Sequence, residues 1–599
     1  MKKILALIIA AIMLLSACGE GENPNTTTAE ARNGIELTVL GTSGGEAEQN
    51  LNLVRDMLTR AGFVVSINMQ PDFASFLTQI EAGNYDLAVT GWTTVTGNPD
   101  YAVRALFHST GDSNRNGLNS ARVDELIDLA ASQTPAEFIE TYTELEHELV
   151  TRNAYMFPLY RTLRTQAVNT TILRQDSVNL PRARSQFWEL LDFVDPGMRE
   201  TQPIITAQAN GNLTSLDPIR GNDGSINQLN SNMYIRIVNM TNDDVVVSDG
   251  SLSWQFVIAE GNQDYYFVLR DDVNFAQVIN ETAVDTGVRV GAEDVVFSLN
   301  RARDRNSVPD HRTFSLHESM QEIAIVTDMD VLDTARDTTT GRTLREIMEE
   351  KTPSAITSLT ADKTAANNAA GAYQVVRVTT HFPFPQVLNY LAHQSGSIVS
   401  EYQVTNINTF DVATFDITTD TIYGDQMNLT VGPTFDHHLW TSGPFIPLYR
   451  NDYQIFFERN PGYMPGTEWA PRVKNLDMRF IPSKDAELAA FRSGELHMMF
   501  TVPVENFDLI ESDDNFHLII VPSHAAQYMI PNFDGVLGDL NLRLAVLHSI
   551  NQDDIMAFYQ NRYFRAYSTL SSLIDTGNVL VADPEQVNYF LNRFWESQE

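Results

Sequence analysis

The chain has little sulfur chemistry and few lysines. Of its 599 residues only Cys18 is a cysteine, so neither a disulfide nor a thiolate zinc site can form within one molecule. Lysine occurs six times, and two of these are Lys2 and Lys3. Forty basic side chains stand against 77 acidic ones, a formal net charge of −37. Such acidity disfavours nucleic acid and anionic lipid, whose phosphates require basic partners, so we expect no nucleic-acid partner.

Recognisable catalytic and cofactor motifs are also missing. The chain contains no H-E-x-x-H, no G-x-x-x-x-G-K-[ST] and no G-x-G-x-x-G. The run Gly41-Thr42-Ser43-Gly44-Gly45 formally fits the G-x-S-x-G elbow of hydrolases, but no downstream acid or histidine lies in a matching motif. The pair His437-His438 could ligate a metal, although adjacent histidines in a polar loop are more often solvated. We therefore expect no enzyme, no catalytic residue, no metal site and no cofactor.

The start of the chain has the pattern of an export signal. Lys2 and Lys3 precede an apolar run, residues 4–15, that is too short to span a bilayer comfortably. Leu15-Ser16-Ala17-Cys18 resembles the lipobox of bacterial lipoproteins, in which the cysteine is lipidated after cleavage. An ordinary secretory signal with a chance cysteine is the alternative. The resemblance predicts a protein that is lipid-anchored at Cys18 in the cell membrane and faces the extracellular side or periplasm.

From Glu36 onward the hydrophobic pattern is that of an α/β fold. Apolar strands alternate with helical spacing, and such strand–helix–strand units form parallel sheets with right-handed crossovers. The expected strands are 37–40, 63–67, 87–89 and 266–269, and the expected helices 51–61, 73–80, 123–131, 135–149 and 292–302. Residues 327–370 are rich in Thr, Ala and Asp and weakly patterned, so we interpret them as an insertion.

Several blocks of sequence together resemble one family, the bacterial extracellular solute-binding proteins of the peptide/nickel ABC-importer family (family 5, oligopeptide/dipeptide-binding type). The blocks are NLTSLDP at 212–218, YYFVLRDDVNF at 265–275, VGAEDVVFSL at 290–299, TSGPF at 441–445, ERNPGY at 458–463, residues 486–499 and LRLAV at 542–546. The resemblance implies an α/β fold, a type II periplasmic-binding-protein-like two-lobe clamp with a third, smaller domain.

The order of the blocks departs from that family. Residues 79–92 and the helix and strand that follow resemble a block that lies near the family's C-terminus, whereas the usual first block begins only near Thr206. The end of the chain, residues 585–591, resembles the helix that ordinarily leads into the strand at 37–40. We therefore interpret the chain as circularly permuted, which is tolerated where the cut loop is exposed. A rearranged gene with an incomplete lobe is the alternative.

This interpretation divides the chain into consecutive parts. The predicted boundaries are 1–17 for the signal peptide, 18–35 for a flexible tether, 36–165 for the permuted part of the lobe that is usually C-terminal, 166–205 for the joining segment, 206–235 and 435–520 for the first lobe, 236–434 for the satellite domain with the insertion, and 521–599 for the remainder of the permuted lobe.

The resemblance also implies a function. Two lobes would close over a peptide or other small solute, and the closed form would dock on the permease and ATPase subunits of an ABC importer. We expect a monomer that makes and breaks no bond in its ligand. Nickel or a metal chelate is an alternative cargo. A surface sensor or adhesin on the same fold, and a hydrolase acting through Ser43, are alternative functions.

The end of the strand at 87–89 is the best candidate for the ligand site, because ligands bind beyond the carboxyl ends of parallel strands. Trp92, Asp100 and Tyr101 lie there, and Trp offers apolar area with one N–H. Peptide-binding members often carry an Asp three residues after this Trp for the ligand's ammonium group, a position held here by Val95. Second-rank candidates, with plain packing as the alternative, are Tyr234, Trp440 and Phe445. The overall acidity leaves a mild preference for cationic or neutral cargo.

Overall fold

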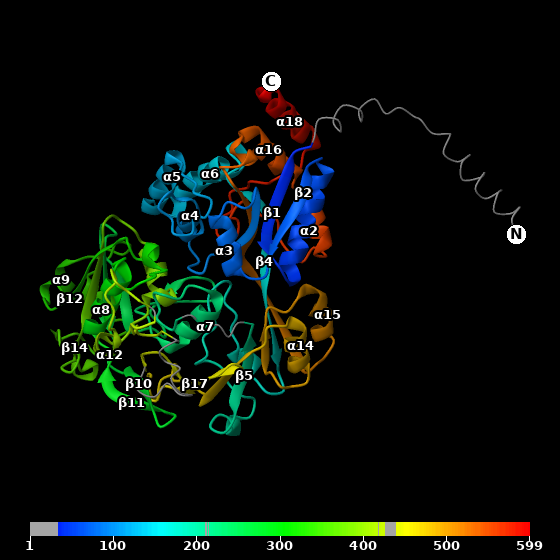
Figure 1. Ribbon diagram of the computed structural model, residues 1–599. Helices are drawn as coiled ribbons and strands as arrows, with labels where there is room; N and C mark the ends of the chain where they lie inside the picture. Colours follow the sequence, from blue (N-terminus) through cyan, green and yellow to red (C-terminus); the bar gives the residue numbers. More distant parts are fainter. Residues whose placement is uncertain (1–33, 134, 210–212, 214, 417, 426–438) are drawn as a thin grey trace, which may run out of the picture. The chain divides into compact units, whose positions relative to one another are not determined.

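The computed structural model describes residues 34–133, 135–209, 213, 215–416, 418–425 and 439–599 (Figure 1). Cys18, the signal peptide, nearly all of the tether and the pair His437-His438 lie outside the described residues. Within the described part, no helix has the length and apolar character needed to cross a membrane. The chain divides into two compact units. Unit 1 ends its first segment at Val89 and adds Ile530–Asn551 and Val581–Glu599, and unit 2 comprises Thr90–Met529 and Gln552–Leu580.

Unit 1 begins with the α/β pattern that the sequence predicts. Strand β1 (Glu36–Thr42) pairs in parallel with β2 (Val64–Gln70) and with the start of β3 (Leu87–Thr93). Helices α2 (Gly45–Arg60) and α3 (Phe73–Glu81) make the two crossovers. The first crossover runs from β1 to β2, and the second runs the opposite way across the sheet, from β2 past β1 to β3. Because both crossovers are expected to be right-handed, α2 and α3 cover opposite faces of the sheet.

The other end of the chain completes unit 1. Helix α16 (Leu540–Ser549) contacts α2, and the C-terminal helix α18 (Pro584–Gln598) packs on α16. The His548 and Phe590 rings stack at 5.8 Å, and the Asp583 N–H donates to the His548 carbonyl. Unit 1 is therefore built from both ends of the chain, as the permuted order requires.

Unit 2 contains several sheets. The long strand β4 (Phe157–Asn169) pairs antiparallel with β21 (Phe516–Pro531) and β20 (Met498–Phe500). A second sheet has the order β17 (Phe445–Arg450), β18 (Gln454–Arg459), β19 (Asn475–Phe480) and β5 (Pro203–Gln208). A third has β12 (Met320–Val326), β15 (Val375–Thr380), β9 (Asp264–Leu269) and β8 (Ser253–Ile258). β10 (Asn274–Ile279) joins β11 (Thr282–Arg289) to β16 (Trp440–Thr441).

The helices of unit 2 flank these sheets. They are α4 (Pro99–Phe107), α5 (Ala121–Ser132), α6 (Pro135–Glu146), α7 (Gly224–Met233), α8 (Ala292–Arg303), α11 (Val387–Leu391), α12 (Glu401–Ile407), α14 (Lys484–Arg492), α15 (Phe507–Glu511) and α17 (Gln552–Phe558). The expected helices at 123–131, 135–149 and 292–302 correspond to α5, α6 with the π-helical turn His147–Arg152, and α8.

Two segments that the sequence pattern assigned to connections are packed into the core of unit 2. In residues 327–370, the short helices α9 (Asp330–Thr334) and α10 (Leu344–Met348) bury Leu332, Leu344 and Met348 against β8, β9 and β15. In residues 166–205, the Trp188 side chain is fully buried between Phe445 and Phe457. The joining segment is thus part of the core.

The predicted domain boundaries do not coincide with the two units. Residues 90–165 and 552–580, which we assigned to the permuted lobe, belong to unit 2 together with the segments assigned to the first lobe and the satellite domain.

Candidate ligand-binding site

Trp92 lies near the end of β3, and Tyr101 lies in α4, the helix that follows. β3 ends at Thr93, and α4 begins after Asn98, whose side chain accepts a hydrogen bond from the Tyr101 N–H at 3.2 Å. The Trp92 and Tyr101 rings lie 5.0 Å apart at 51°. The Trp92 Nε1–H is buried and has no hydrogen-bond partner within the described chain. A buried unpaired donor costs free energy, so this N–H is a hydrogen-bond donor that the described chain leaves unused.

Asp100 is fully buried and is already paired. Arg104 Nε donates to both carboxylate oxygens, at 3.1 and 3.0 Å, and the Tyr390 hydroxyl donates to Oδ2 at 2.6 Å. Burial alone would lower the pKa of Arg104, but the Asp100 carboxylate raises it overall. These contacts fasten the start of α4 to α11, and the Asp100 charge is neutralised within the protein. The structure thus offers no support for Asp100 as the counter-ion of a ligand ammonium group.

The second-rank candidates lie in packed surroundings. Tyr234 is fully buried, and its hydroxyl donates to the Leu216 carbonyl at 3.0 Å. Phe445 is equally buried, with its ring 6.0 Å from that of Trp188. Trp440 is half-buried between Phe275 and Tyr402. Among the residues that the structure describes, neither these three nor Trp92 and Tyr101 line the cavity described next.

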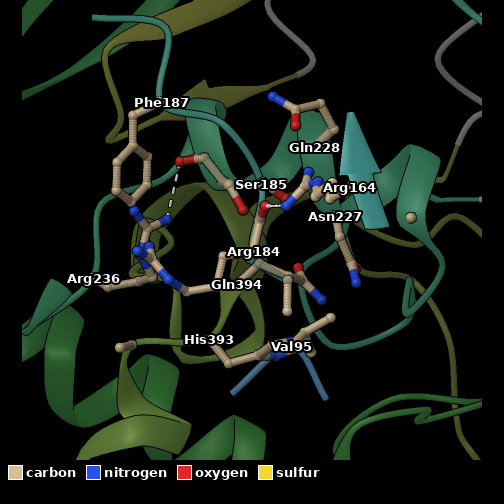
Figure 2. Close-up of a pocket in the computed structure, with 14 residues that line it drawn as sticks. Val95, Arg164, Arg184, Ser185, Phe187, Asn227, Gln228, Arg236, His393 and Gln394 are labelled. Atoms are coloured by element: carbon tan, nitrogen blue, oxygen red, sulfur yellow. Dashed lines mark hydrogen bonds between the residues drawn. The ribbon is translucent and has the colours of Figure 1, made fainter. Parts of the chain in front are cut away.

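A cavity of about 90 Å³ opens beside this strand end, within unit 2 (Figure 2). An engineered cavity that accepts benzene has a volume of ~150 Å³, so the cavity holds a small polar group and not a whole peptide. Its lining comes from five segments that are distant in sequence: Val95, Arg164, Ala183, Arg184, Ser185, Phe187, Gly224, Asn227, Gln228, Ser231, Arg236, Ala392, His393 and Gln394.

Three arginines of this lining are held by backbone carbonyl groups. Arg164 Nη1, from β4, donates to Pro181 O at 2.8 Å and to Arg184 O. Arg184 Nη2 donates to Thr241 O. Arg236 Nη1 donates to Ser231 O at 3.0 Å and to Tyr234 O at 3.1 Å. Because carbonyl groups carry no net charge, these bonds orient the guanidinium groups without neutralising them.

No carboxylate forms an ion pair with Arg164, Arg184 or Arg236 in the part of the chain that the structure describes. The guanidinium carbons of Arg184 and Arg236 lie 5.5 and 5.3 Å from the centre of the Phe187 ring, which both contact. Burial lowers the pKa of Arg164 and of Arg184 to about 10, and it also lowers that of Arg236. All three remain cationic at neutral pH, so positive charge is concentrated here.

Two acidic groups lie nearby without pairing with the arginines. Glu189 is 2% exposed, and burial raises its pKa to about 7. Asp244 Oδ2 lies 2.8 Å from His524 Nε2. Glu189 therefore holds its proton more tightly than an ordinary glutamate does, and Asp244, hydrogen-bonded to His524, partly offsets through its charge the lowering of the Arg184 pKa by burial.

His393 and Asn227 add unsatisfied polar atoms to the lining. His393 Nδ1 contacts the Ser395 hydroxyl at 2.8 Å, whereas its Nε2 is buried without a partner, as is Asn227 Oδ1. Burial, together with the charge of Arg236, lowers the pKa of His393 to about 3. The His393 ring also lies 6.4 Å from that of Tyr101. Tyr101 thus lies next to a lining residue, although neither Tyr101 nor Trp92 lines the cavity itself.

None of the six ligand-site candidates predicted from the sequence lines the cavity. Val95, noted as a position where peptide-binding members often carry an Asp, does line it, whereas Arg164, Arg184, Phe187, Arg236 and His393 were missed. A signal was available in Arg182-Ala183-Arg184-Ser185-Gln186-Phe187, where arginine and an aromatic residue occur together in a segment of an acidic chain.

The family model for bacterial extracellular solute-binding proteins, family 5 Middle, matches residues 252–589, more than half of the chain. The protein belongs to this family. Membership confirms the predicted family and the fold class, an α/β two-lobe clamp of the periplasmic-binding-protein type. The match leaves out residues up to 251, where the block that we interpret as displaced is found.

Solved structures show more distant similarity. The binding protein MoaA from A. tumefaciens R10, in complex with mannopinic acid, is 19% identical, with 66% of this chain and 65% of that chain covered and a TM-score of 0.43. DppA from Helicobacter pylori, in complex with the peptide STSA, is 17% identical, with 66% of each chain covered and a TM-score of 0.42. The Escherichia coli murein tripeptide binding protein MppA is 14% identical, with 53% and 48% covered and a TM-score of 0.34. The matched part thus spans between about half and two thirds of these proteins. No curated protein matches the chain.

Proposed function

We propose that this protein is an exported, lipid-anchored solute-binding protein that captures an extracellular solute for an ABC importer, with an oligopeptide as the first candidate. The observation that carries the proposal is the polar cavity in unit 2 next to Trp92 and Tyr101, in a chain of a solute-binding family. Buried polar groups are normally paired. Unpaired atoms on Asn227 and His393 belong to the lining that a polar ligand would complete.

The groups that line the cavity are suited to binding a solute without reacting with it. Arginines that stay charged and a histidine whose pKa lies at about 3 can donate or accept hydrogen bonds but are poor proton carriers at neutral pH. The binding energy would instead favour a closed form of the protein, which the permease and ATPase subunits would recognise. We propose a monomer, tethered through Cys18, that acts without a cofactor.

The experiment is native mass spectrometry of the protein as purified from cells, followed by thermal unfolding with the released compounds. We expect a co-purifying solute that raises Tm and that is recovered unchanged, because a ligand that binds only the folded state stabilises it. A solute that is consumed during incubation contradicts the proposal. Ser43→Ala would then identify hydrolysis at the G-x-S-x-G run if it abolishes turnover.

Cargo that contains a metal is a second candidate, favoured as an anionic chelate by the cationic lining. Within the described residues, no group of three or more His, Cys, Asp or Glu side chains is placed to hold a bare metal ion. Calorimetric titration with nickel alone, with citrate alone and with an equimolar nickel–citrate mixture separates the cases: a chelate binds more tightly than either component.

A further inference from the structure

We infer that the cavity selects solutes that present two carboxylates close together, such as a peptide with a C-terminal acidic residue or a free dicarboxylic acid. This inference rests on the proposed function, because it names the chemistry of the ligand for the same site. It reverses the mild preference for cationic or neutral cargo that the acidic composition indicates.

The first argument is the balance of charge around the cavity. Arg164, Arg184 and Arg236 bring three positive charges, and no described carboxylate forms an ion pair with any of them. Burial raises the pKa of Glu189 to about 7, and Asp244, which accepts a hydrogen bond from His524, partly offsets through its charge the lowering of the Arg184 pKa by burial. An uncompensated buried charge is costly. The three guanidinium charges therefore exceed the negative charge nearby, and carboxylates of a ligand would compensate the excess.

The second argument is geometry. Guanidinium groups match carboxylates through paired N–H donors, and backbone carbonyls already fix all three side chains in place. Phe187, in contact with Arg184 and Arg236, further restricts them. Pre-oriented donors lose little conformational entropy when a ligand binds. The three guanidinium groups are therefore oriented to bind an anionic group, and the described chain does not supply one.

The third argument is size. A cavity of about 90 Å³ is smaller than the ~150 Å³ engineered cavity that accepts benzene. The cavity therefore takes carboxylate groups and not a whole peptide, so the rest of a peptide would have to lie outside the arginine set.

The test is isothermal titration calorimetry with the peptides Ala-Ala-Glu, Ala-Ala-Gln and Ala-Ala-Lys and with glutarate. We expect Ala-Ala-Glu or glutarate to bind at least about tenfold more tightly than Ala-Ala-Gln. Tighter binding of Ala-Ala-Glu identifies an acidic peptide as the source of the carboxylates, and tighter binding of glutarate identifies a free dicarboxylic acid. Equal affinity for Ala-Ala-Glu and Ala-Ala-Gln, or a preference for Ala-Ala-Lys, overturns the inference.

Arg184→Gln should bring the affinities for Ala-Ala-Glu and Ala-Ala-Gln close together, and Arg184→Lys should have an intermediate effect because it keeps the charge without the paired donors. The matched control is Arg182→Gln, two residues away, whose side chain is 41% exposed and whose contact with Asp243 is 3.5 Å long. Circular dichroism would verify that each variant is folded. An Arg182→Gln effect as large as that of Arg184→Gln contradicts the assignment.

The two proposals fail in different ways. If neutral or basic peptides bind and raise Tm, the protein captures solutes but the cavity does not select carboxylates. If no probe binds, the inference is overturned, and native mass spectrometry of the purified protein then decides whether solute capture stands.

Discussion

Glu189 shows how a single buried side chain links the stability of this protein to pH. Burial raises its pKa from 4.5 to about 7, so the folded chain holds this proton more tightly than the unfolded chain does. The free energy of unfolding therefore falls as the pH rises from about 4.5 to about 7 and is constant above that range, as far as this group is concerned.

Glu189→Gln removes this penalty. We expect the variant and the native protein to be similarly stable near pH 4.5, and the variant to be more stable above pH 7 by at most about 3 kcal/mol, the value of a shift of this size. Urea unfolding of the ligand-free protein across this pH range measures the difference. A constant difference between the two proteins at every pH would contradict the assignment.

Trp92 gives a second prediction about one side chain. Trp92→Phe removes the unpaired Nε1–H and keeps most of the ring contact with Tyr101. We expect the free energy of unfolding to stay the same or rise by up to about 1 kcal/mol, and the affinity for the co-purified solute to fall several-fold. Denaturation and calorimetry measure the two quantities separately.

The matched control is Trp254→Phe, because Trp254 Nε1 donates to Asn368 Oδ1 at 2.9 Å. This variant should lose about 1 kcal/mol of stability and leave the affinity unchanged. A Trp92→Phe variant that behaves like Trp254→Phe would place the Trp92 indole in a purely structural role.

The joining segment 166–205 is the element whose role differs most from the interpretation of its sequence. It passes through the core at Trp188 and carries Arg184 and Phe187 into the cavity. Trp188→Ala should therefore lower the free energy of unfolding by ~3–5 kcal/mol, the range for large aromatic residues in cores. Val194→Ala in the same segment, at a side chain that is 51% exposed, should change it by less than about 0.5 kcal/mol. Urea denaturation of both variants provides the comparison, and similar losses would contradict it.

The helices and strands of unit 1 could be predicted because the apolar residues of each recur at a regular spacing. In α2, Leu51, Val54 and Leu58 fall at helical spacing and are buried, and Gly62 after the helix adopts a φ of 94° that favours glycine. Residues 327–370 carry no such repeat. Helices of five residues bury one or two side chains each, too few to give a period.

The cavity could not be predicted from local patterns for a related reason. Arg184 and Arg236 are buried only because Phe187, the end of α7 and residues 392–394 meet around them. A local sequence pattern does not distinguish a buried arginine from a solvated one. Asp100 illustrates the converse, since its hydrogen bond from Tyr390 comes from α11, 290 residues away.

The interpretation of the chain as circularly permuted can be tested on the whole protein. Unit 1 contains both Glu36 and the C-terminal helix α18, so a flexible linker of ~10 Gly and Ser residues should be able to join residue 599 to residue 36. New termini between Pro196 and Gly197, an exposed turn, would restore the usual family order. We expect this rearranged protein to fold and to bind the same solute, because cuts in exposed turns are tolerated.

Circular dichroism and calorimetry against the native order measure this outcome. The control opens the chain between Ile204 and Ile205 inside β5, where the backbone pairs with β19, and should not fold. If the first rearranged protein also fails to fold, the chain does not differ from the family only by a change in the position of its termini.

The contrast between an acidic exterior and a cationic cavity has a kinetic consequence. A net charge of −37 repels an anionic solute at long range, whereas Arg184 and Arg236 attract it only at short range, once it has reached the cavity. Salt screens charges separated by more than ~8 Å at physiological ionic strength. Added NaCl should therefore raise the association rate and also raise the dissociation rate, and stopped-flow fluorescence can measure both. An association rate that falls with NaCl would show attraction at long range. For an anionic solute, this protein would exchange its cargo faster in salty surroundings than in dilute ones.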